Sequence, residues 1–292
     1  MLISEELQQK VRQIEWATRR MVNDTMAGEY HSVFKGRGME FDEVRPYAEG
    51  DDVRTIDWNV TARTGFPHVK RFVEERELTL LLMVDASASL DFGTRHQMKG
   101  ELAVEVCALM AFAAIRNNDR VGLLVFTDEV ELFIPPRKGR SHVLRLIRDL
   151  LYFRPRQRGT NIPAALEYVR NVQRRRSVIF LFSDLVQQGI ETALSLTARR
   201  HDLIVASITD EREFTLPAAG ILRLRDPETG REVVVDSSSR AVRTAFEQSR
   251  RQARLDRQSL LRRLELDHVE LATGADYLPP LVRLFRARAR RM

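Results

Sequence analysis

The chain has 292 residues and 43% of them are hydrophobic, enough for one large core or two smaller ones, so one or two domains are expected. Its single cysteine, Cys107, excludes an internal disulfide and suits a reducing compartment. The net charge of +6 could attract nucleic acid, but charges of both signs are scattered and no nucleic-acid-binding motif is recognisable, so no nucleic-acid partner is expected.

The N-terminal region predicts a helix over residues 4–27, because apolar residues recur there at spacings of three and four. The first residues lack the basic and apolar regions of a signal peptide. No apolar run along the chain approaches the ~18 residues needed to cross a bilayer. We therefore expect a cytoplasmic protein without a transmembrane segment.

Residues 29–68 form a long segment without regular periodicity, rich in Gly, Asp, Arg and aromatic residues. A segment of this length in a compact protein is usually functional or packed as a subdomain of its own. We expect residues 1–76, the N-terminal helix and this segment, to pack on the main domain. The apolar side chains expected to be partly buried are Phe34, Phe41, Tyr47, Ile56, Trp58 and Phe66.

From residue 69 onward, short apolar runs alternate with helical patterns. The predicted strands are 69–73, 78–84, 121–126, 129–134, 178–182 and 203–208, and the predicted helices are 96–116, 141–153, 162–174 and 190–200. This alternation indicates an α/β fold with a doubly wound, mostly parallel sheet, whose main domain we assign to residues 77–210. In such sheets, ligands bind beyond the carboxyl ends of the strands, near the point where the strand order reverses.

The last part of the chain, residues 211–292, is expected to complete the fold with a hairpin and helices. Two short strands, 221–225 and 232–235, flank the turn sequence Asp226-Pro227-Glu228-Thr229-Gly230. A charged helix over 240–266, a strand over 269–272 and a helix over 278–290 follow. We interpret the arginines at its end as a solvated helix end, where cations are favoured; they are Arg283, Arg286, Arg288, Arg290 and Arg291.

Three short polar fragments follow apolar strands or lie in loops between elements: Asp85-Ala86-Ser87-Ala88-Ser89, Gly159-Thr160-Asn161 and Ser183-Asp184-Leu185. All three are expected at the carboxyl edge of one sheet, where they supply carboxylates and hydroxyls but no imidazole or thiolate. An all-oxygen donor set suits a hard divalent cation. We expect Mg²⁺, with Mn²⁺ or Ca²⁺ as alternatives.

Together the three fragments resemble the metal-ion-dependent adhesion site of von Willebrand factor A domains. The motif DxSxS is a weak signal alone, but the later threonine and aspartate at the right strand ends make the combination specific. The resemblance implies a von Willebrand factor A, Rossmann-like fold. It also implies that Ser87 and Ser89 coordinate directly, Thr160 directly or through water, and Asp85 and Asp184 mostly through water.

A second resemblance covers nearly the whole chain. It rests on Arg45-Pro46-Tyr47, Gly50-Asp51-Asp52, Arg54, Ile56-Asp57-Trp58, Ala62-Arg63, Arg200-His201-Asp202, Leu216-Pro217 and the turn at 226–230. These residues resemble the signature of a bacterial family catalogued as domain of unknown function 58. Its members often accompany MoxR-type AAA+ ATPases, which implies such an ATPase, or its client, as the partner. The candidate partner-binding residues are Arg45, Asp51, Asp52, Arg54, Asp57, Trp58 and Arg63.

The leading hypothesis is a metal-dependent protein-interaction module, an adaptor or assembly factor that recruits an acidic residue of its partner through the ion. The alternative is a magnesium-dependent phosphoester hydrolase, although no nucleophile–base pair is recognisable in the sequence. Two structural readings stay open. Ser87, Ser89 and Asp184 could instead cap helices or turns. The acidic and arginine residues before the main domain could be structural ion pairs rather than a partner surface.

Overall fold

The computed structural model describes residues 28, 30, 38–75, 77–93 and 97–291, so the helix expected over 4–27 lies outside the described residues. The chain divides into two compact units. One is Phe34–Leu78, and the other contains Met1–Val33 and Thr79–Met292. The expected packing of residues 1–76 on the main domain stays a prediction.

The larger unit contains a mixed sheet of six strands in the order β10-β7-β6-β3-β4-β5. Five strands are parallel, and β5 pairs antiparallel with β4 at one edge. The strands are β3 (Thr79–Asp85), β4 (Arg120–Phe126), β5 (Val130–Arg137), β6 (Val178–Ser183), β7 (Asp202–Thr209) and β10 (Asp267–Ala272). Continuous apolar runs form the central strands because both faces of the sheet are covered. The strand order reverses between β3 and β6.

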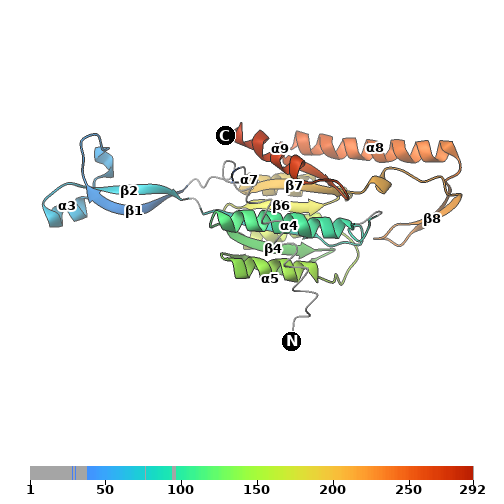
Figure 1. Ribbon diagram of the computed structural model, residues 1–292, viewed down its shortest axis with the longest axis horizontal. Helices are drawn as coiled ribbons and strands as arrows, with labels where there is room; N and C mark the ends of the chain where they lie inside the picture. The colour runs from blue at the N-terminus through green and yellow to red at the C-terminus, as the bar shows by residue number, and fades with distance from the viewer. Residues whose placement is uncertain (1–27, 29, 31–37, 76, 94–96, 292) are drawn as a thin grey trace, which may run out of the picture. The chain divides into compact units, whose positions relative to one another are not determined.

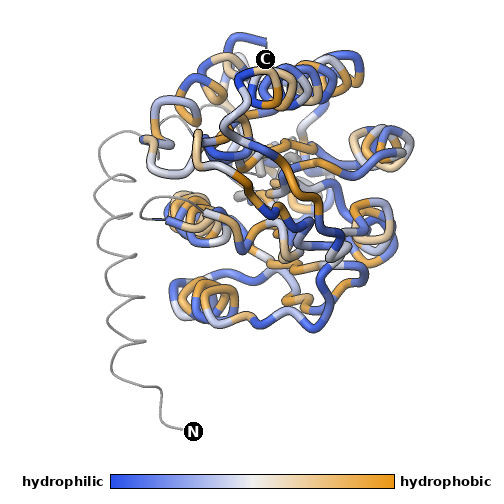
Figure 2. Tube along the Cα trace, turned by 90° about the vertical axis from the view of Figure 1, so that its right-hand side faces the viewer, coloured by the Kyte–Doolittle hydropathy of each residue, from blue (hydrophilic) through white to orange (hydrophobic). Residues whose placement is uncertain are grey.

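Helices cover both faces of this sheet (Figure 2). They are α4 (Lys99–Arg116), α5 (Arg140–Leu151), α6 (Ile162–Val172), α7 (Glu191–Arg200), α8 (Arg240–Arg263) and α9 (Leu278–Ala289). Leu166 of α6, Leu194 of α7 and Leu261 of α8 share one core with alternate residues of the strands. On the opposite face Phe285 of α9 packs edge-on against Phe180, with ring centroids 6.5 Å apart. Figure 1 shows α4 and α5 side by side. The predicted α/β fold is confirmed as this mixed, mostly parallel sheet flanked by helices.

The smaller unit is an antiparallel hairpin of β1 (Gly38–Pro46) and β2 (His68–Glu75), joined by η2 (Val53–Thr55) and α3 (Trp58–Thr64). The predicted strand at 69–73 therefore pairs with β1 and does not belong to the main sheet. The expected partial burial is wrong for Trp58 and Phe66, which are 69% and 72% exposed. A two-stranded hairpin with one short helix has no second layer in which to bury them.

The C-terminal region contains the predicted hairpin, β8 (Ile221–Arg225) and β9 (Glu232–Asp236), as a separate two-stranded sheet. The predicted strand at 269–272 extends the main sheet as β10, beside β7. The interpretation of the terminal arginines as solvated is wrong for Arg288. This side chain is 7% exposed and forms ion pairs with Asp202 and Asp267. It therefore links α9 to the first residues of β7 and β10. Among the described residues, no helix is long and apolar enough to cross a membrane.

Candidate metal centre

The end of β3 carries the first three polar side chains of the site. Asp85 is completely buried and its carboxylate is already hydrogen-bonded: Oδ1 accepts from the Ser87 amide at 2.9 Å and Oδ2 from the Ser183 hydroxyl at 2.7 Å. The Ser87 and Ser89 hydroxyls lie 2.9 Å apart, beyond the strand end. Neither serine caps a described helix, because α4 follows Met98.

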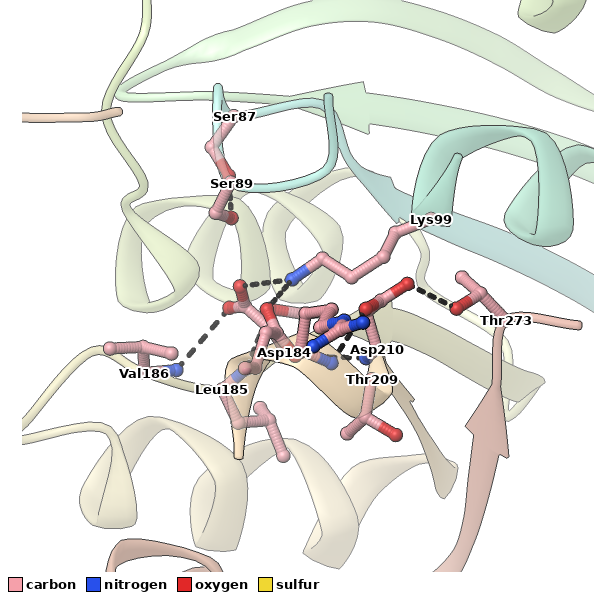
Figure 3. A network of polar contacts seen from close by, with 12 residues as sticks. Ser87, Ser89, Lys99, Asp184, Leu185, Val186, Thr209, Asp210 and Thr273 are labelled. Carbon is pink, nitrogen blue, oxygen red and sulfur yellow. Dashed lines mark hydrogen bonds and ion pairs between the residues drawn. The ribbon is translucent and has the colours of Figure 1, made fainter. Parts of the chain in front are cut away.

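The end of neighbouring β6 supplies Ser183 and Asp184. Ser183 links the two strand ends through its bond to Asp85. Asp184 is 4% exposed, and its Oδ2 lies 3.0 Å from the ammonium nitrogen of Lys99 (Figure 3). It does not cap α7, which begins after Ile190, but its Oδ1 accepts a hydrogen bond from the Val186 amide at 3.4 Å, as a local turn would provide. The following residue, Leu185, has a φ of 55°, a left-handed conformation that costs energy for a residue with a Cβ.

Lys99, the first residue of α4, is a fully buried cation inside this network. Its ammonium also lies 2.6 Å from Glu213 Oε1, and Glu213 in turn accepts a hydrogen bond from the Asp210 amide beyond the end of β7. Burial lowers the pKa of Lys99, but the charges of Asp184 and Glu213 outweigh it and the net pKa is raised. Lys99 is therefore a fixed positive charge beside Asp184.

Thr160 lies in the loop before α6. The Gly159 amide donates to Asp128 Oδ2 at 3.0 Å, and a Cβ on Gly159 would lie 2.2 Å from Asp128 Oδ1, so a larger residue would have to displace the Asp128 side chain. The Thr160 hydroxyl donates to Glu228 Oε1 at 2.9 Å, although Glu228 is 68 residues away in the chain. The Ser89 hydroxyl also lies near this carboxylate and favours its ionised form.

Excess negative charge shapes the electrostatics of the site. Burial, with a contribution from the charge of Asp184, raises the pKa of Asp85 to about 6. Burial also raises the pKa of Glu228, as do the charges of Asp184 and Asp226. Both shifts have the sign expected where carboxylates gather with too little compensating positive charge.

These residues fit a hard cation. Neighbouring ligands of an octahedral magnesium ion at about 2.0–2.1 Å are roughly 2.9 Å apart, which is the separation of the Ser87 and Ser89 hydroxyls. The Ala88 amide bonds the Arg158 carbonyl at 2.9 Å, so the loop that carries Thr160 runs beside the loop of Ser87 and Ser89. Nowhere in the described ranges do three or more His, Cys, Asp or Glu side chains form a metal-holding group, so the hydroxyls are essential to such a site.

The structure thus brings together the predicted set Asp85, Ser87, Ser89, Thr160 and Asp184 at the carboxyl edge of the sheet, where the strand order reverses. The sequence indicates no further charged groups there, whereas the structure adds Lys99, Glu213 and Glu228 to the site. Glu213 had a detectable signal, since Asp210 and Glu213 form a capping box. No local pattern placed Glu228 beside Thr160.

The candidate partner-binding residues all lie in the smaller unit. Arg45 forms a bidentate ion pair with Asp51, in which Nη1 lies 2.8 Å from Oδ2 and Nη2 lies 2.6 Å from Oδ1. This pair lowers the pKa of Asp51. Asp52 caps η2, and Asp57 caps α3 through the amides of residues 59 and 60. These four have structural roles. Arg54, Trp58 and Arg63 are exposed to solvent, as is Asp52.

Comparison with known proteins shows which family the chain belongs to. A family profile described as "Protein of unknown function DUF58" matches residues 43–256. The chain belongs to the DUF58 family. It is 32% identical over 285 residues to "Uncharacterized protein Rv1480" of Mycobacterium tuberculosis, covering 96% of this chain and 89% of that protein. It is 28% identical over 164 residues to "Uncharacterized protein MAV169" of Mycobacterium avium, covering 54% of this chain and 94% of that protein.

Among solved structures, this DUF58 protein is similar to an aerotolerance-related membrane protein from Bacteroides fragilis. The TM-score is 0.50 at 16% sequence identity, over 74% of this chain and 100% of that one. At this level of identity the likeness concerns the fold alone.

Proposed function

We propose that this DUF58 protein is a metal-dependent protein-interaction module whose larger unit is a von Willebrand factor A-type domain. The observation that carries the proposal is the convergence of Asp85, Ser87, Ser89, Thr160 and Asp184 at the point where the sheet order reverses. The two serine hydroxyls, hydrogen-bonded at 2.9 Å, are also separated by the edge length of a magnesium octahedron, and the backbone amide of Ser87 is held by the buried Asp85.

In this proposal the site combines neutral ligands with a negatively charged carboxylate. Ser87, Ser89 and Thr160 supply neutral oxygen ligands. Asp85, whose oxygens are both engaged by hydrogen bonds, acts through water and supplies negative charge. A bound Mg²⁺ would supply positive charge and a coordination position held by an exchangeable water. A carboxylate from another protein is the side chain best suited to replace that water.

The proposed partner is a MoxR-type AAA+ ATPase or its client, and this part rests on family resemblance alone. A cytoplasmic location stays a prediction. The adaptor role requires only that the partner present an aspartate or glutamate to the site.

Affinity capture tests the proposal directly. The tagged full chain is incubated with a purified MoxR-type ATPase in Mg²⁺ or in EDTA, using wild type, Asp85→Ala and the exposed control Asp256→Ala. We expect capture only with Mg²⁺, and only by wild type and the control, while circular dichroism shows that all three are folded. Capture that is indifferent to both EDTA and Asp85→Ala would sink the proposal.

Phosphoester hydrolysis remains the second candidate, and one observation favours it. Glu228 gives the site a half-buried carboxylate that the three sequence fragments did not contain, and a carboxylate with a raised pKa can act as a general base. Incubation with a generic phosphodiester and Mg²⁺ separates the two functions. Turnover by wild type that Asp85→Ala abolishes would establish the hydrolase, whereas the interaction module predicts no turnover.

A further inference from the structure

The β8–β9 turn is built to present Glu228. Asp226 Oδ1 accepts from the amides of Glu228 and Thr229 at 2.9 and 3.2 Å, and Asp226 Oδ2 accepts from the Thr229 hydroxyl at 2.6 Å. The Gly230 amide bonds the Asp226 carbonyl at 2.9 Å, with Gly230 in the left-handed region at φ 72°. Asp226 therefore fixes the turn, and Glu228 remains free to reach outward to Thr160 and Ser89.

The hairpin behind this turn is otherwise weakly held. It is a two-stranded sheet of its own, and its apolar side chains Ile221, Val233 and Val234 are 76%, 58% and 66% exposed. Isolated two-stranded hairpins are marginally stable in water, because no second layer covers them. At its base, Ser237 bonds the Gly220 carbonyl through its amide at 2.8 Å and its hydroxyl at 2.7 Å. The hairpin is thus anchored at its base, and its tip contacts the candidate metal centre.

We propose that Glu228 is an intrinsic carboxylate ligand of the metal centre, and that the β8–β9 hairpin must move away before a partner's carboxylate can bind. This inference rests on the proposed function. The Glu228 carboxylate bonds one proposed ligand, Thr160, at 2.9 Å, and it therefore occupies the region where an incoming acidic side chain would meet the ion. The protein's own hairpin and its partner then compete for one position.

Such competition regulates the site. A partner binds only the fraction of molecules whose hairpin is displaced, so its apparent dissociation constant rises by the inverse of that fraction. A marginal hairpin is suited to this exchange, because its displacement breaks few contacts beyond the tip. Removing the Glu228 carboxylate is expected to open one coordination position and to uncouple the hairpin from the metal.

The experiment uses the full chain and the metal alone, with Mn²⁺ as a paramagnetic probe and Mg²⁺ for hydrogen exchange. The variants are wild type, Glu228→Ala and the matched control Glu232→Ala, which removes an exposed carboxylate from the same hairpin. Asp85→Ala is the metal-site control. Water-proton relaxation counts exchangeable water on bound Mn²⁺, and mass spectrometry follows amide exchange over residues 221–236.

In wild type and Glu232→Ala, Mg²⁺ should slow amide exchange in the hairpin. In Glu228→Ala this slowing should be lost, bound Mn²⁺ should carry about one more exchangeable water, and metal affinity should fall on the order of tenfold. The proposed role of Glu228 would be overturned if wild type and Glu228→Ala carried the same number of exchangeable waters on Mn²⁺ and if Mg²⁺ left amide exchange in the wild-type hairpin unchanged. If Mn²⁺ still bound wild type but not Asp85→Ala, that result would leave the proposed metal centre standing. No Mn²⁺ binding by wild type would overturn both.

Discussion

Lys99→Met tests the ion pairs at the centre of the site, because methionine keeps most of the apolar stem and removes the ammonium with its charge and its hydrogen bonds. Lys99 is fully buried and joins Asp184, whose side chain is 5% exposed, to Glu213, whose side chain is 27% exposed. Removing one member of a buried ion pair typically costs 3–5 kcal/mol, because the other charge is left uncompensated. Glu213 can turn to water but Asp184 cannot, so we expect about 3 kcal/mol, the lower end of that range.

For a domain of 150–250 residues, 1 kcal/mol corresponds to a melting-temperature shift of roughly 2–4 °C, so Lys99→Met should melt about 6–12 °C below wild type. Calorimetry in EDTA measures the shift without any contribution from a bound ion. The exposed lysine control, Lys138→Met, should change stability by no more than about 0.5 kcal/mol.

Two further measurements test whether the loss of stability comes from uncompensated carboxylate charge. Adding Glu213→Gln to Lys99→Met should recover part of the loss, because one of the two stranded carboxylates is then gone. Mg²⁺ should stabilise Lys99→Met more than wild type, because the ion supplies positive charge near Asp184. A Lys99→Met protein that melts within 2 °C of wild type in EDTA would refute the argument.

Three other predictions concern sites away from the metal centre. Burial, together with neighbouring arginines, lowers the pKa of His201 to about 4, so the unfolded chain binds a proton near 6.5 and the folded chain does not. Stability should therefore fall by up to ~3 kcal/mol as pH drops from 6.5 towards 4, and urea midpoints should show a shallower loss in His201→Gln. Arg288→Met removes the ion pairs to Asp202 and Asp267, and should cost about 3 kcal/mol by urea denaturation. Exposed Trp58, studied by fluorescence in a Trp16→Phe background, should emit at long wavelength and be quenched by acrylamide; protected emission would show that the smaller unit is packed against other surfaces.

The sheet could be predicted from the sequence because parallel strands are buried on both faces. Runs such as Leu80–Val84 and Val178–Phe182 are apolar throughout, and no other short element in an α/β protein needs that pattern. The five predicted ligands could be found for the same reason. Four of them directly follow apolar runs, and the carboxyl ends of parallel strands lie at one edge, whereas Thr160 was found from its place in the loop before a helix.

The rest of the site depends on tertiary contacts that no local pattern records. Lys99 begins an apolar helix, where a lysine is normally solvated, and only the approach of Asp184 and Glu213 explains its complete burial. Glu228 belongs to a turn whose sequence predicts a hairpin but not the direction in which that hairpin extends. The exposure of Trp58 was mispredicted because an aromatic-rich segment need not contain a second layer to bury its aromatics.

Charge balance explains why the site would select an acidic partner. Lys99 lies between Asp184 and Glu213, and because Glu213 is partly exposed to water, we count the buried ammonium against the buried Asp184. The two positive charges of a divalent ion are then matched by Asp85 and Glu228, one carboxylate each. A partner's carboxylate that displaces Glu228 preserves this balance, whereas a neutral side chain would leave one positive charge uncompensated in a largely buried site, which is costly. On this charge balance a carboxylate suits both the proposed intrinsic ligand and the proposed partner, as the proposed competition between them requires.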